Sequence, residues 1–541
     1  MAADQLTRPK TSSNAIHLVL FPFPAQGHMI PLMQLGNVLA FKGLIITFVC
    51  AEHRVPLMQE AEYRGQYHPN LRIVTLPDAV PPGEHGVDEG TDSVTWSITG
   101  TQKMVDPFKI LISDLIQSTN SDGGSSSSPP LGIISDYALS WTQDVADEFS
   151  IPRYIFFPSA ASGLLFMFYV PTLVAKGQLP LSPSLGDDRE AATKEESYIY
   201  VPGLPPVRKR DVSSAWQATS QQWLQRFSLR NAERLHEAAG ILVNSFCALD
   251  ADAIIALRSS LVNPKMVSVR TVGPLLPRVF FDNHTFSSCS PQDGTLEASQ
   301  SRCLHWLDTQ RTSSVIYISF GSIVLPSFAQ IHELALGLEA SKQPFVWVLR
   351  QPSSTASRYC SSPEQLSSLL PEGFQLRTEK QGLILSVWAP QLLILSHPST
   401  AAFLTHCGWN STLESVTRGL PMLGMPFFAD QMMNCRMLVD QLQIAAEIPK
   451  GDDGLARRDA VSNAVTLVMG SAGEAMRQRA KELRDAAKQA VMDEHGCSHN
   501  NLTTFVDEIR KHAIYHAQLS PASHSSSSPS SSSSSSSWSS S

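Results

Sequence analysis

Residues 388–431 gather side chains that can hold a nucleotide and a sugar, and they read WAPQLLILSHPSTAAFLTHCGWNSTLESVTRGLPMLGMPFFADQ. Trp388 follows an apolar run, predicted to be a buried strand, and can offer a flat face to a base. A second short strand is predicted to end at His406, and a helix to begin near Asn410. The N-terminus of a helix presents free N–H groups and the positive end of its dipole, so this turn suits phosphate.

The remainder of the segment supplies groups that bind polyols. Glu414 lies four residues after Asn410, on the same helix face one turn deeper, where its carboxylate can accept both hydroxyls of a ribose. Asp430 and Gln431 close the segment, and both side chains can bind sugar hydroxyls. Each residue alone also fits an ordinary strand–helix–strand segment, with Trp388 in the core and Asn410 as a helix cap. In this combination and order they indicate a sugar-nucleotide site.

The same segment resembles, nearly end to end, the signature box of plant UDP-dependent glycosyltransferases of family 1. The run HCGWNSTLES carries much of the likeness. The resemblance implies that Trp388 stacks on uracil, that the Ala389 backbone and Gln391 complete nucleoside recognition, and that Glu414 binds the ribose. A Gln at the end of the box is common in members that use glucose, so the implied donor is UDP-glucose. The implied donor-binding residues are Ser322, Trp388, Ala389, Gln391, His406, Trp409, Asn410, Ser411, Glu414, Asp430 and Gln431.

His28 is the candidate base. It follows the predicted strand 16–23, before a helix expected from about Ile30 to Phe41, at the edge where doubly wound sheets bind ligands. Imidazole is the side chain best suited to take a proton near neutral pH. A lone His at such a place is more often a capping or surface residue. However, PAQGHMIPLMQL is similar to the family's N-terminal motif, whose His deprotonates the acceptor hydroxyl.

Asp136 is the candidate partner of His28. It stands at the end of the predicted strand 131–135, in SDYALSW, and matches the family's Asp that orients the catalytic His. Such a pair has the logic of a triad without its nucleophile, because the substrate oxygen attacks directly. The alternative, Asp136 as the N-cap of the following helix, is physically plausible.

Apolar strands that alternate with helical patterns predict parallel sheets. The resemblance implies an α/β fold of the GT-B type, in which two Rossmann-like domains face each other across a cleft. We expect the acceptor in the first domain and the donor in the second. The predicted divisions are a disordered N-terminus (1–15), an acceptor-binding domain (16–272), a linker (273–300), a UDP-sugar-binding domain (301–495), a helix that packs back on the first domain (496–515) and a disordered Ser-rich tail (516–541).

Composition and charge limit the possible partners and the cellular compartment of the protein. A net charge of −8 over 541 residues and a pI near 6.1 argue against nucleic acid as the main partner. The eight cysteines form no C-x-x-C pair, and no signal peptide precedes the first strand, so we expect a reducing, cytoplasmic compartment. We also expect a monomer. Residues 154–175 carry no charge, yet prolines and small polar residues interrupt them, which favours a buried strand and a core helix over a membrane span.

No cofactor or metal is expected. Asp250-Ala251-Asp252 invites a manganese interpretation, but a helical run follows, and carboxylates at a helix start explain the pair better. The family resemblance implies inverting transfer to a small-molecule acceptor, and a flavonoid or other phenol is the first expectation by family frequency. Terpenoid and hormone acceptors stay open, as does a sugar-nucleotide-binding protein without catalysis. A hydrolase would need a G-x-S-x-G elbow and a dehydrogenase a G-x-G-x-x-G turn, and neither is found at the strand ends that would carry it.

Overall fold

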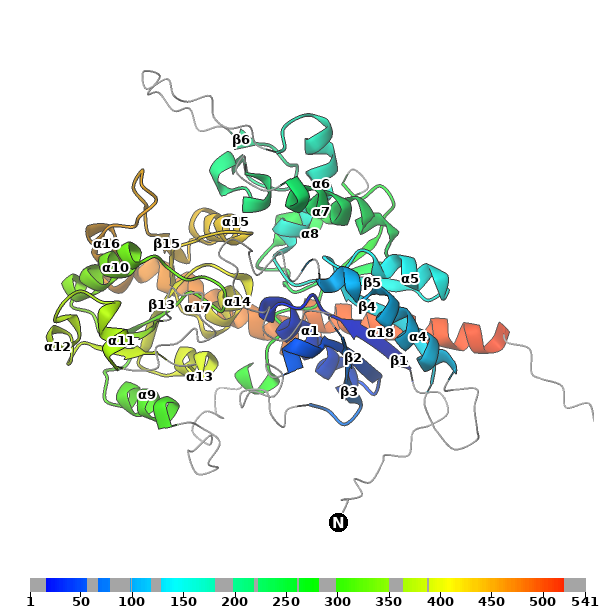
Figure 1. Ribbon diagram of the computed structural model, residues 1–541, viewed down its shortest axis with the longest axis horizontal. Helices are drawn as coiled ribbons and strands as arrows, with labels where there is room; N and C mark the ends of the chain where they lie inside the picture. The colour runs from blue at the N-terminus through cyan, green and yellow to red at the C-terminus, as the bar shows by residue number, and fades with distance from the viewer. Residues whose placement is uncertain are drawn as a thin grey trace, which may run out of the picture.

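A computed structural model describes residues 16–55, 67–77, 98, 100–117, 128–180, 198–217, 222–259, 262–281, 298–349, 363–386 and 389–519. Within them the chain forms two parallel sheets, one of seven strands and one of six, each flanked by helices (Figure 1). The predicted α/β architecture of two Rossmann-like units is therefore present. The predicted disordered end 1–15, residues 520–541 of the tail and residues 282–297 of the linker lie outside the described residues.

The first sheet has the strand order β3-β2-β1-β4-β5-β8-β9, and every neighbouring pair is parallel. Its inner strands are apolar and buried because helices cover both faces, which explains runs without alternation. The chain winds outward from β1 to β3 and then returns to β4 on the other side of β1. The winding therefore reverses between β1 and β4, at the kind of sheet edge where doubly wound folds bind ligands. The strands are β1 (His17–Phe21), β2 (Ile45–Ala51), β3 (Leu71–Leu76), β4 (Pro130–Asp136), β5 (Arg153–Phe157), β8 (Gly240–Val243) and β9 (Ser268–Thr271).

The helices of this first domain differ from prediction at one important place. Helix α1 begins at Gln26, before the predicted start near Ile30, and so includes His28 in its first turn. The reason is that the N–H groups of His28 and Met29 both bond to the carbonyl of Ala25, each at 2.9 Å, and close the turn early. The helices are α1 (Gln26–Phe41), α4 (Val105–Gln117), α5 (Thr142–Glu148), α6 (Ala161–Ala175), α7 (Gln222–Glu233) and α8 (Ala251–Leu257). Short 3-10 turns are η1 (Glu52–Arg54), η2 (Lys209–Asp211), η3 (Ser214–Trp216), η4 (Arg234–Glu237) and η5 (Arg278–Phe281), and β6 (Tyr198–Ile199) pairs antiparallel with β7 (Val207–Arg208).

The second sheet repeats the winding, with the order β12-β11-β10-β13-β14-β15 and only parallel neighbours. Its winding reverses between β10 and β13. The strands are β10 (Val315–Ser319), β11 (Phe345–Val348), β12 (Gly382–Leu385), β13 (Thr400–Thr405), β14 (Met422–Gly424) and β15 (Ala445–Glu447). The helices are α9 (Ala298–Asp308), α10 (Phe328–Ser341), α11 (Pro363–Ser368), α12 (Phe374–Arg377), α13 (Gln391–Ser396), α14 (Trp409–Arg418), α15 (Gln431–Arg436), the π-turn η7 (Met437–Gln441), α16 (Arg458–Met469), the 3-10 turn η8 (Ser471–Gly473) and α17 (Glu474–Met492).

The last helix, α18 (Cys497–Leu519), crosses from the second domain back beneath the first sheet (Figure 1). Ser498 Oγ donates to the carbonyl of Gly273 at 2.5 Å, and Asn501 Nδ2 donates to that of Thr271 at 2.9 Å. The ring of Phe505 packs edge-on against Tyr154 with 5.0 Å between centroids. The helix thus ties the end of the chain to the strand edge at β9.

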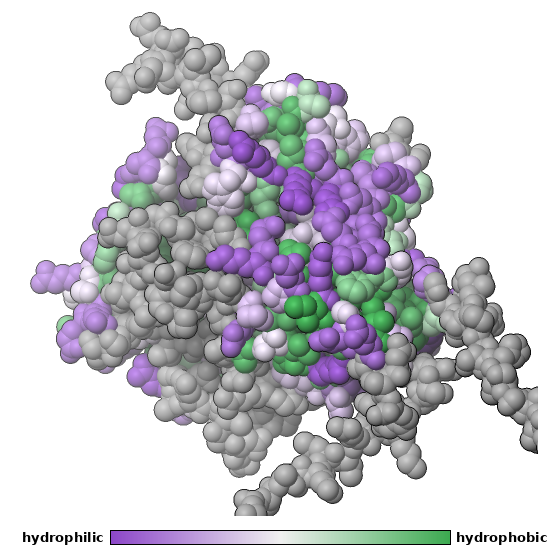
Figure 2. Space-filling view, turned by 45° about the vertical axis from the view of Figure 1, so that its right-hand side comes forward, coloured by the Kyte–Doolittle hydropathy of each residue, from purple (hydrophilic) through white to green (hydrophobic). Residues whose placement is uncertain are grey.

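The uncharged stretch 154–175 is the strand β5 followed by helix α6, as predicted. Among the described helices, none combines the length and the apolar character that a membrane crossing requires. On the face that Figure 2 shows, hydrophilic residues predominate among those described, and hydrophobic ones form separate patches.

The two aspartates of the D-x-D sequence have different surroundings. Asp250 is buried and accepts from the N–H groups of Ala161 and Ser162, at 3.0 and 3.3 Å, and from Ser245 Oγ at 2.5 Å. Its carboxylate therefore caps the start of α6 as well as standing before α8. Asp252 is exposed in the first turn of α8. No group of three or more His, Cys, Asp or Glu within the described ranges is arranged to hold a metal.

Candidate active site

His28 and Asp136 meet where the first sheet reverses its winding. His28 lies in the first turn of α1, just after β1, and Asp136 is the last residue of the neighbouring strand β4. His28 Nδ1 is 2.8 Å from Asp136 Oδ2. The other carboxylate oxygen accepts from the N–H of Ala138 at 2.9 Å, which fixes the carboxylate in the turn. The two residues that the sequence selected as base and orienter are therefore hydrogen-bonded.

The surroundings of this pair favour a protonated imidazole. Burial by itself would lower the pKa of His28, but the charge of Asp136, the hydrogen bond to it and the charge of Asp430 together raise that pKa above its ordinary value. Asp136 is fully buried, whereas 26% of the His28 side chain is exposed. Because Nδ1 bonds to Asp136, the neutral ring carries its proton there and keeps the lone pair of Nε2 for a substrate.

Two aromatic rings border His28. Phe23 lies 5.2 Å from it between centroids, and Tyr137 lies 6.3 Å away with its ring nearly parallel, at 21°. Burial and the charges of Asp136 and Asp430 raise the pKa of the Tyr137 hydroxyl, so Tyr137 stays neutral. The space around the candidate base therefore has apolar walls.

The opposite side of the site is the N-terminus of α14. Gly408 precedes this helix with an extended backbone and offers no side chain to cap it. The N–H groups of Trp409, Asn410 and Ser411 form the first turn, and together with the positive end of the helix dipole they make an anion-binding position. The predicted start near Asn410 is thus correct to within one residue.

His406 is held between two glycines at the reversal point of the second sheet. It follows β13 directly, and β10 leads into Gly321 and Ser322 beside it. A Cβ on Gly408 would lie 2.3 Å from His406 Nε2, and one on Gly321 would lie 2.7 Å from Cε1. Both positions must be glycine for the ring to stand where it does. The structure therefore brings His406, Ser322 and the first turn of α14 together, as the sequence predicted for one site.

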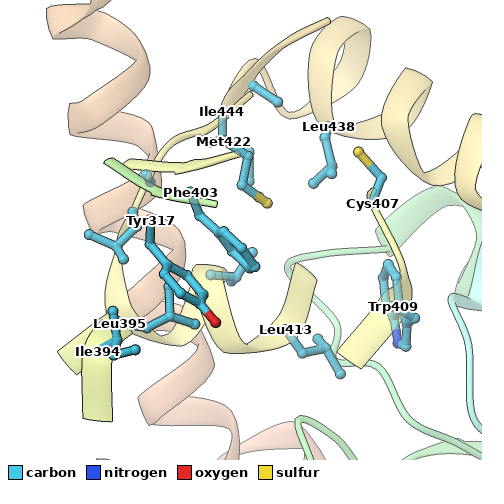
Figure 3. Close-up of a cluster of buried hydrophobic side chains, with 14 of the residues drawn as sticks. Tyr317, Ile394, Leu395, Phe403, Cys407, Trp409, Leu413, Met422, Leu438 and Ile444 are labelled. Carbon is cyan, nitrogen blue, oxygen red and sulfur yellow. The ribbon is translucent and has the colours of Figure 1, made fainter. Parts of the chain in front are cut away.

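Gln391, Ser411 and Glu414 form a hydrogen-bonded group between α13 and α14. Gln391 Nε2 lies 3.2 Å from Ser411 Oγ and 2.5 Å from Glu414 Oε2. The hydroxyl of Tyr317 donates to Gln391 Oε1 at 3.1 Å. Ala389, which is buried, immediately precedes this group. Three residues predicted to hold the nucleoside and the diphosphate are thus adjacent, and Tyr317 supports them from the core (Figure 3).

Trp409 lies in a different environment from the other predicted donor residues. Its side chain is only 5% exposed and lies at the edge of the buried cluster around Phe403 and Leu413 (Figure 3). The indole N–H donates to the carbonyl of Asn244, in the first domain, at 2.7 Å. The side chain therefore joins the two domains. Trp388, predicted to stack on uracil, lies outside the described residues.

Asp430 and Gln431 lie at the start of α15. Ser159 of the first domain donates to Asp430 Oδ2, and Asn434 Nδ2 donates to the same oxygen at 3.1 Å. Gln431 Oε1 accepts from the N–H groups of Phe427 and Phe428, at 2.9 and 3.1 Å. One end of the Gln431 amide thus shapes the loop that carries Asp430.

One further bond joins the two halves of the site. Asn410 Nδ2 donates to the carbonyl of Gly27, the residue before His28, at 3.1 Å. The candidate base and the anion-binding turn are therefore neighbours across the cleft, where α1 and α14 lie close together in Figure 1. The sequence did not single out Gly27, Ser159 or Asn244 as site residues. Their partners are far away along the chain, so no local pattern could have indicated them.

The chain is similar over most of its length to known sugar transferases. Residues 272–469 match the family model described as UDP-glucoronosyl and UDP-glucosyl transferase. The 7-deoxyloganetin glucosyltransferase of Gardenia jasminoides is 34% identical over 498 residues, 91% of this chain and 97% of that protein. The (R)-mandelonitrile beta-glucosyltransferase of Prunus dulcis is 32% identical over 512 residues, 93% of this chain and 98% of that protein. These matches decide the family.

This chain is a plant-type UDP-glycosyltransferase of family 1. The solved structure of Phytolacca americana UGT2, complexed with UDP-2fluoro-glucose and pterostilbene, superposes with a TM-score of 0.73 at 28% identity, covering 92% of this chain and all of that one. The predicted family and the predicted GT-B fold are thereby confirmed.

In a UDP-glycosyltransferase the sugar leaves a diphosphate as a hydroxyl attacks its anomeric carbon. Such a reaction needs a proton acceptor for the hydroxyl and positive groups for the diphosphate. The structure has an imidazole bonded to a carboxylate at His28 and Asp136, and a helix start with free N–H groups at α14, beside His406. The bond between Asn410 and Gly27 places them on facing edges of the same cleft.

Proposed function

We propose that this UDP-glycosyltransferase is an inverting enzyme that transfers glucose from UDP-glucose to a hydroxyl of a small lipophilic acceptor. The observation that supports it most directly is the 2.8 Å bond between His28 Nδ1 and Asp136. This bond orients the imidazole of His28 to accept a proton, next to the helix start that we propose binds the diphosphate. No nucleophilic side chain is needed, because the acceptor oxygen itself attacks.

In the proposed reaction, His28 Nε2 takes the proton of the acceptor hydroxyl. The acceptor oxygen forms a bond to the anomeric carbon from the face opposite UDP, while the bond from that carbon to the diphosphate oxygen breaks. UDP leaves with the bonding electron pair, and an α-linked donor becomes a β-O-glucoside. Asp136 stabilises the imidazolium that forms, in the same way that it raises the pKa of His28.

For the donor, we propose that the first turn of α14, His406 and Ser322 hold the diphosphate and stabilise its developing charge. Glu414 would bind the ribose hydroxyls, with Gln391 and the Ala389 backbone at the nucleoside. Trp388 would stack on uracil. The sugar would lie near Trp409, Asp430 and Gln431, with the Trp409 contribution coming from its backbone, because its indole is buried and bonded to Asn244.

We propose that the reaction needs no metal, because the helix start and the two polar side chains beside it can supply the positive potential. EDTA is therefore expected to leave the rate unchanged in an assay of UDP release. Strong inhibition that added Mn²⁺ or Mg²⁺ reverses would overturn this part of the mechanism and direct attention back to Asp250 and Asp252.

Glucose as the donor sugar is supported by Gln431 and by the glucosyltransferase names of both relatives. Their named acceptors differ, so we propose the class of small lipophilic hydroxyl compounds, with phenols including flavonoids first and terpenoid alcohols second. The rings of Phe23 and Tyr137 around His28 favour an acceptor with an apolar body. A sugar-nucleotide-binding protein without catalysis is the rival, and the bonded pair of His28 and Asp136 argues against it.

The test is an acceptor screen with UDP-glucose, read by mass spectrometry for glucosides and by UDP release. We expect a β-glucoside with at least one phenol or terpenoid alcohol, and His28→Ala is expected to abolish it while UDP binding persists. If the chain binds UDP-glucose but forms no glucoside with any acceptor, the binding-protein reading replaces ours. If His28→Ala keeps normal turnover, the proposed base is wrong.

We also propose a cytoplasmic monomer. The cysteines within the described part of the chain are all free thiols, as expected in a reducing compartment. Light scattering during size exclusion tests the oligomeric state, and a mass near 59.1 kDa is expected.

A further inference from the structure

Helix α1 contains a proline one turn after its start. Pro31 is buried inside the helix and has no N–H. In an α-helix the N–H of residue 31 would donate to the carbonyl four residues earlier, which belongs to Gly27. The Gly27 carbonyl therefore lacks its regular helical donor.

The second domain supplies a donor to that carbonyl. Asn410 Nδ2 lies 3.1 Å from the Gly27 oxygen, and Asn410 is in the first turn of α14. Gly27 is exposed and carries no side chain, and a Cβ on it would lie 3.9 Å from the same nitrogen. The bond links the residue before the candidate base to the helix start that faces the donor.

We propose that Pro31 is a positioning residue: by withholding an N–H it keeps the Gly27 carbonyl open to Asn410, and this bond sets the approach of His28 to the donor. The inference rests on the proposed function of His28 and Asn410. It adds a residue that touches neither substrate and acts through the backbone of α1.

The chemistry of the amide explains why this bond matters for transfer. An Asn amide has two N–H groups, so one can bond to Gly27 while the other points to a diphosphate oxygen. The same side chain then contacts the leaving group and the segment that carries the base. Transfer depends on how the attacking oxygen is aligned, and a misplacement of about 1 Å costs up to a hundredfold in rate.

The other contacts between the domains do not duplicate this bond. Ser159 bonds to Asp430, and Asn244 bonds to Trp409, both on loops after β5 and β8. Among the residues that the structure describes, only the hydrogen bond from Asn410 joins the second domain to α1. The position of His28 along the cleft therefore depends on it.

The experiment is Pro31→Ala, with Pro171→Ala in α6 as the matched control, because Pro171 also lies inside a helix. Alanine at position 31 adds an N–H that can donate to the Gly27 carbonyl in a regular helical hydrogen bond, and alanine suits a helix interior. With UDP-glucose and para-nitrophenol as probes, or the best acceptor from the screen, kcat is expected to fall about three- to tenfold, as for one lost hydrogen bond. The kcat of Pro171→Ala is expected to stay within about twofold of that of the parent protein, because Pro171 lies away from the site.

Two readouts separate positioning from general damage. The affinity for UDP and the pH at which kcat/KM reaches half of its maximum are expected to match those of the parent protein, because Asp136 and His28 keep their bond. In a double-mutant cycle, the effect of Pro31→Ala is expected to vanish when Asn410 is already alanine, since Pro31 acts through Asn410.

Equal effects of Pro31→Ala and Pro171→Ala, or effects of Pro31→Ala and Asn410→Ala that simply add, would overturn the inference. His28→Ala distinguishes this failure from a failure of the proposed function. If that variant is inactive while Pro31→Ala behaves like its control, only the role of Pro31 is lost. If His28→Ala is active, the mechanism on which the inference rests is lost as well.

Discussion

At the scale of single residues, the proposed mechanism depends on the charge state of His28. A base accepts a proton only while it is neutral, and the neighbouring carboxylates raise the pKa of His28 above 6.5. Below that pKa the ring is protonated and cannot act. We therefore expect kcat/KM to rise with pH through an inflexion above 6.5, measured between pH 5 and 9 at fixed ionic strength. A flat profile over this range would contradict the role of His28.

Asp136→Asn provides the control for that profile. Without the carboxylate, burial dominates and the pKa of His28 falls below its ordinary value, so the inflexion is expected to move to lower pH. The rate above the inflexion is expected to fall on the order of a hundredfold, because the imidazolium loses its counter-charge. An inflexion that stays in place would mean that another group titrates.

Glu414→Ala tests the ribose site. Glu414 accepts from Gln391 at 2.5 Å on the face of α14 that leads to the anion-binding turn. If it binds the ribose in the ground state and the transition state alike, its loss raises the KM for UDP-glucose, about tenfold, with little change in kcat. Glu372→Ala, at an exposed position of the same domain, is the control and should leave both constants unchanged. An unchanged KM in Glu414→Ala would remove the assignment.

These residues show what the sequence could predict. His28 follows β1, Asp136 ends β4 and His406 follows β13, so all three lie at the carboxyl ends of parallel strands, which local patterns reveal. The environment of Trp409 was not predictable, because the direction of its indole depends on the carbonyl of Asn244 in the other domain. The same holds for Gln431, whose amide oxygen is occupied by the backbone of its own loop.

At the scale of elements, both halves of the site are strand-to-helix junctions at reversal points of a sheet. The sequence predicted most of these strands and helices correctly, since continuous apolar runs mark buried parallel strands. It placed the start of α1 too late, near Ile30 instead of Gln26. The actual turn is closed by two N–H groups on the Ala25 carbonyl, a backbone arrangement that no side chain announces.

Gly321→Ala tests the junction that holds His406. Gly321 has φ +74 and its Cβ would press on the imidazole, whereas Gly454 has φ +77 and open space around its Cβ. Alanine at either position costs about 1–2 kcal/mol of stability through the left-handed backbone. Only Gly321→Ala should also displace His406, so we expect its kcat to fall about tenfold or more while Gly454→Ala keeps its kcat. Equal kcat values would show that the ring position is not needed.

At the scale of the whole molecule, the two domains are joined by the cleft contacts and by α18. The sequence predicted a last helix within 496–515, and the structure has α18 from Cys497 to Leu519. Its first turn is stabilised by Ser498 on the Gly273 carbonyl, a contact over 225 positions of sequence that local propensity does not contain. Long-range contacts of this kind decide where the second domain sits relative to the first.

Phe505 is the residue through which α18 stabilises the first domain. It is fully buried in the cluster that also contains Leu18 and Leu20 of β1, the strand that leads to His28. Replacing it with alanine leaves a cavity, so we expect Phe505→Ala to lower the free energy of unfolding by about 3–5 kcal/mol. Ile514→Ala, on the same helix but 60% exposed, should change it by less than about 0.5 kcal/mol. Urea unfolding followed by circular dichroism measures the free energy of unfolding of both variants.

Because β1 and α18 share this cluster, Phe505→Ala should also reduce the temperature at which transferase activity is lost. If the two variants unfold at the same urea concentration, α18 does not contribute to the stability of the first domain, and the first sheet alone positions His28.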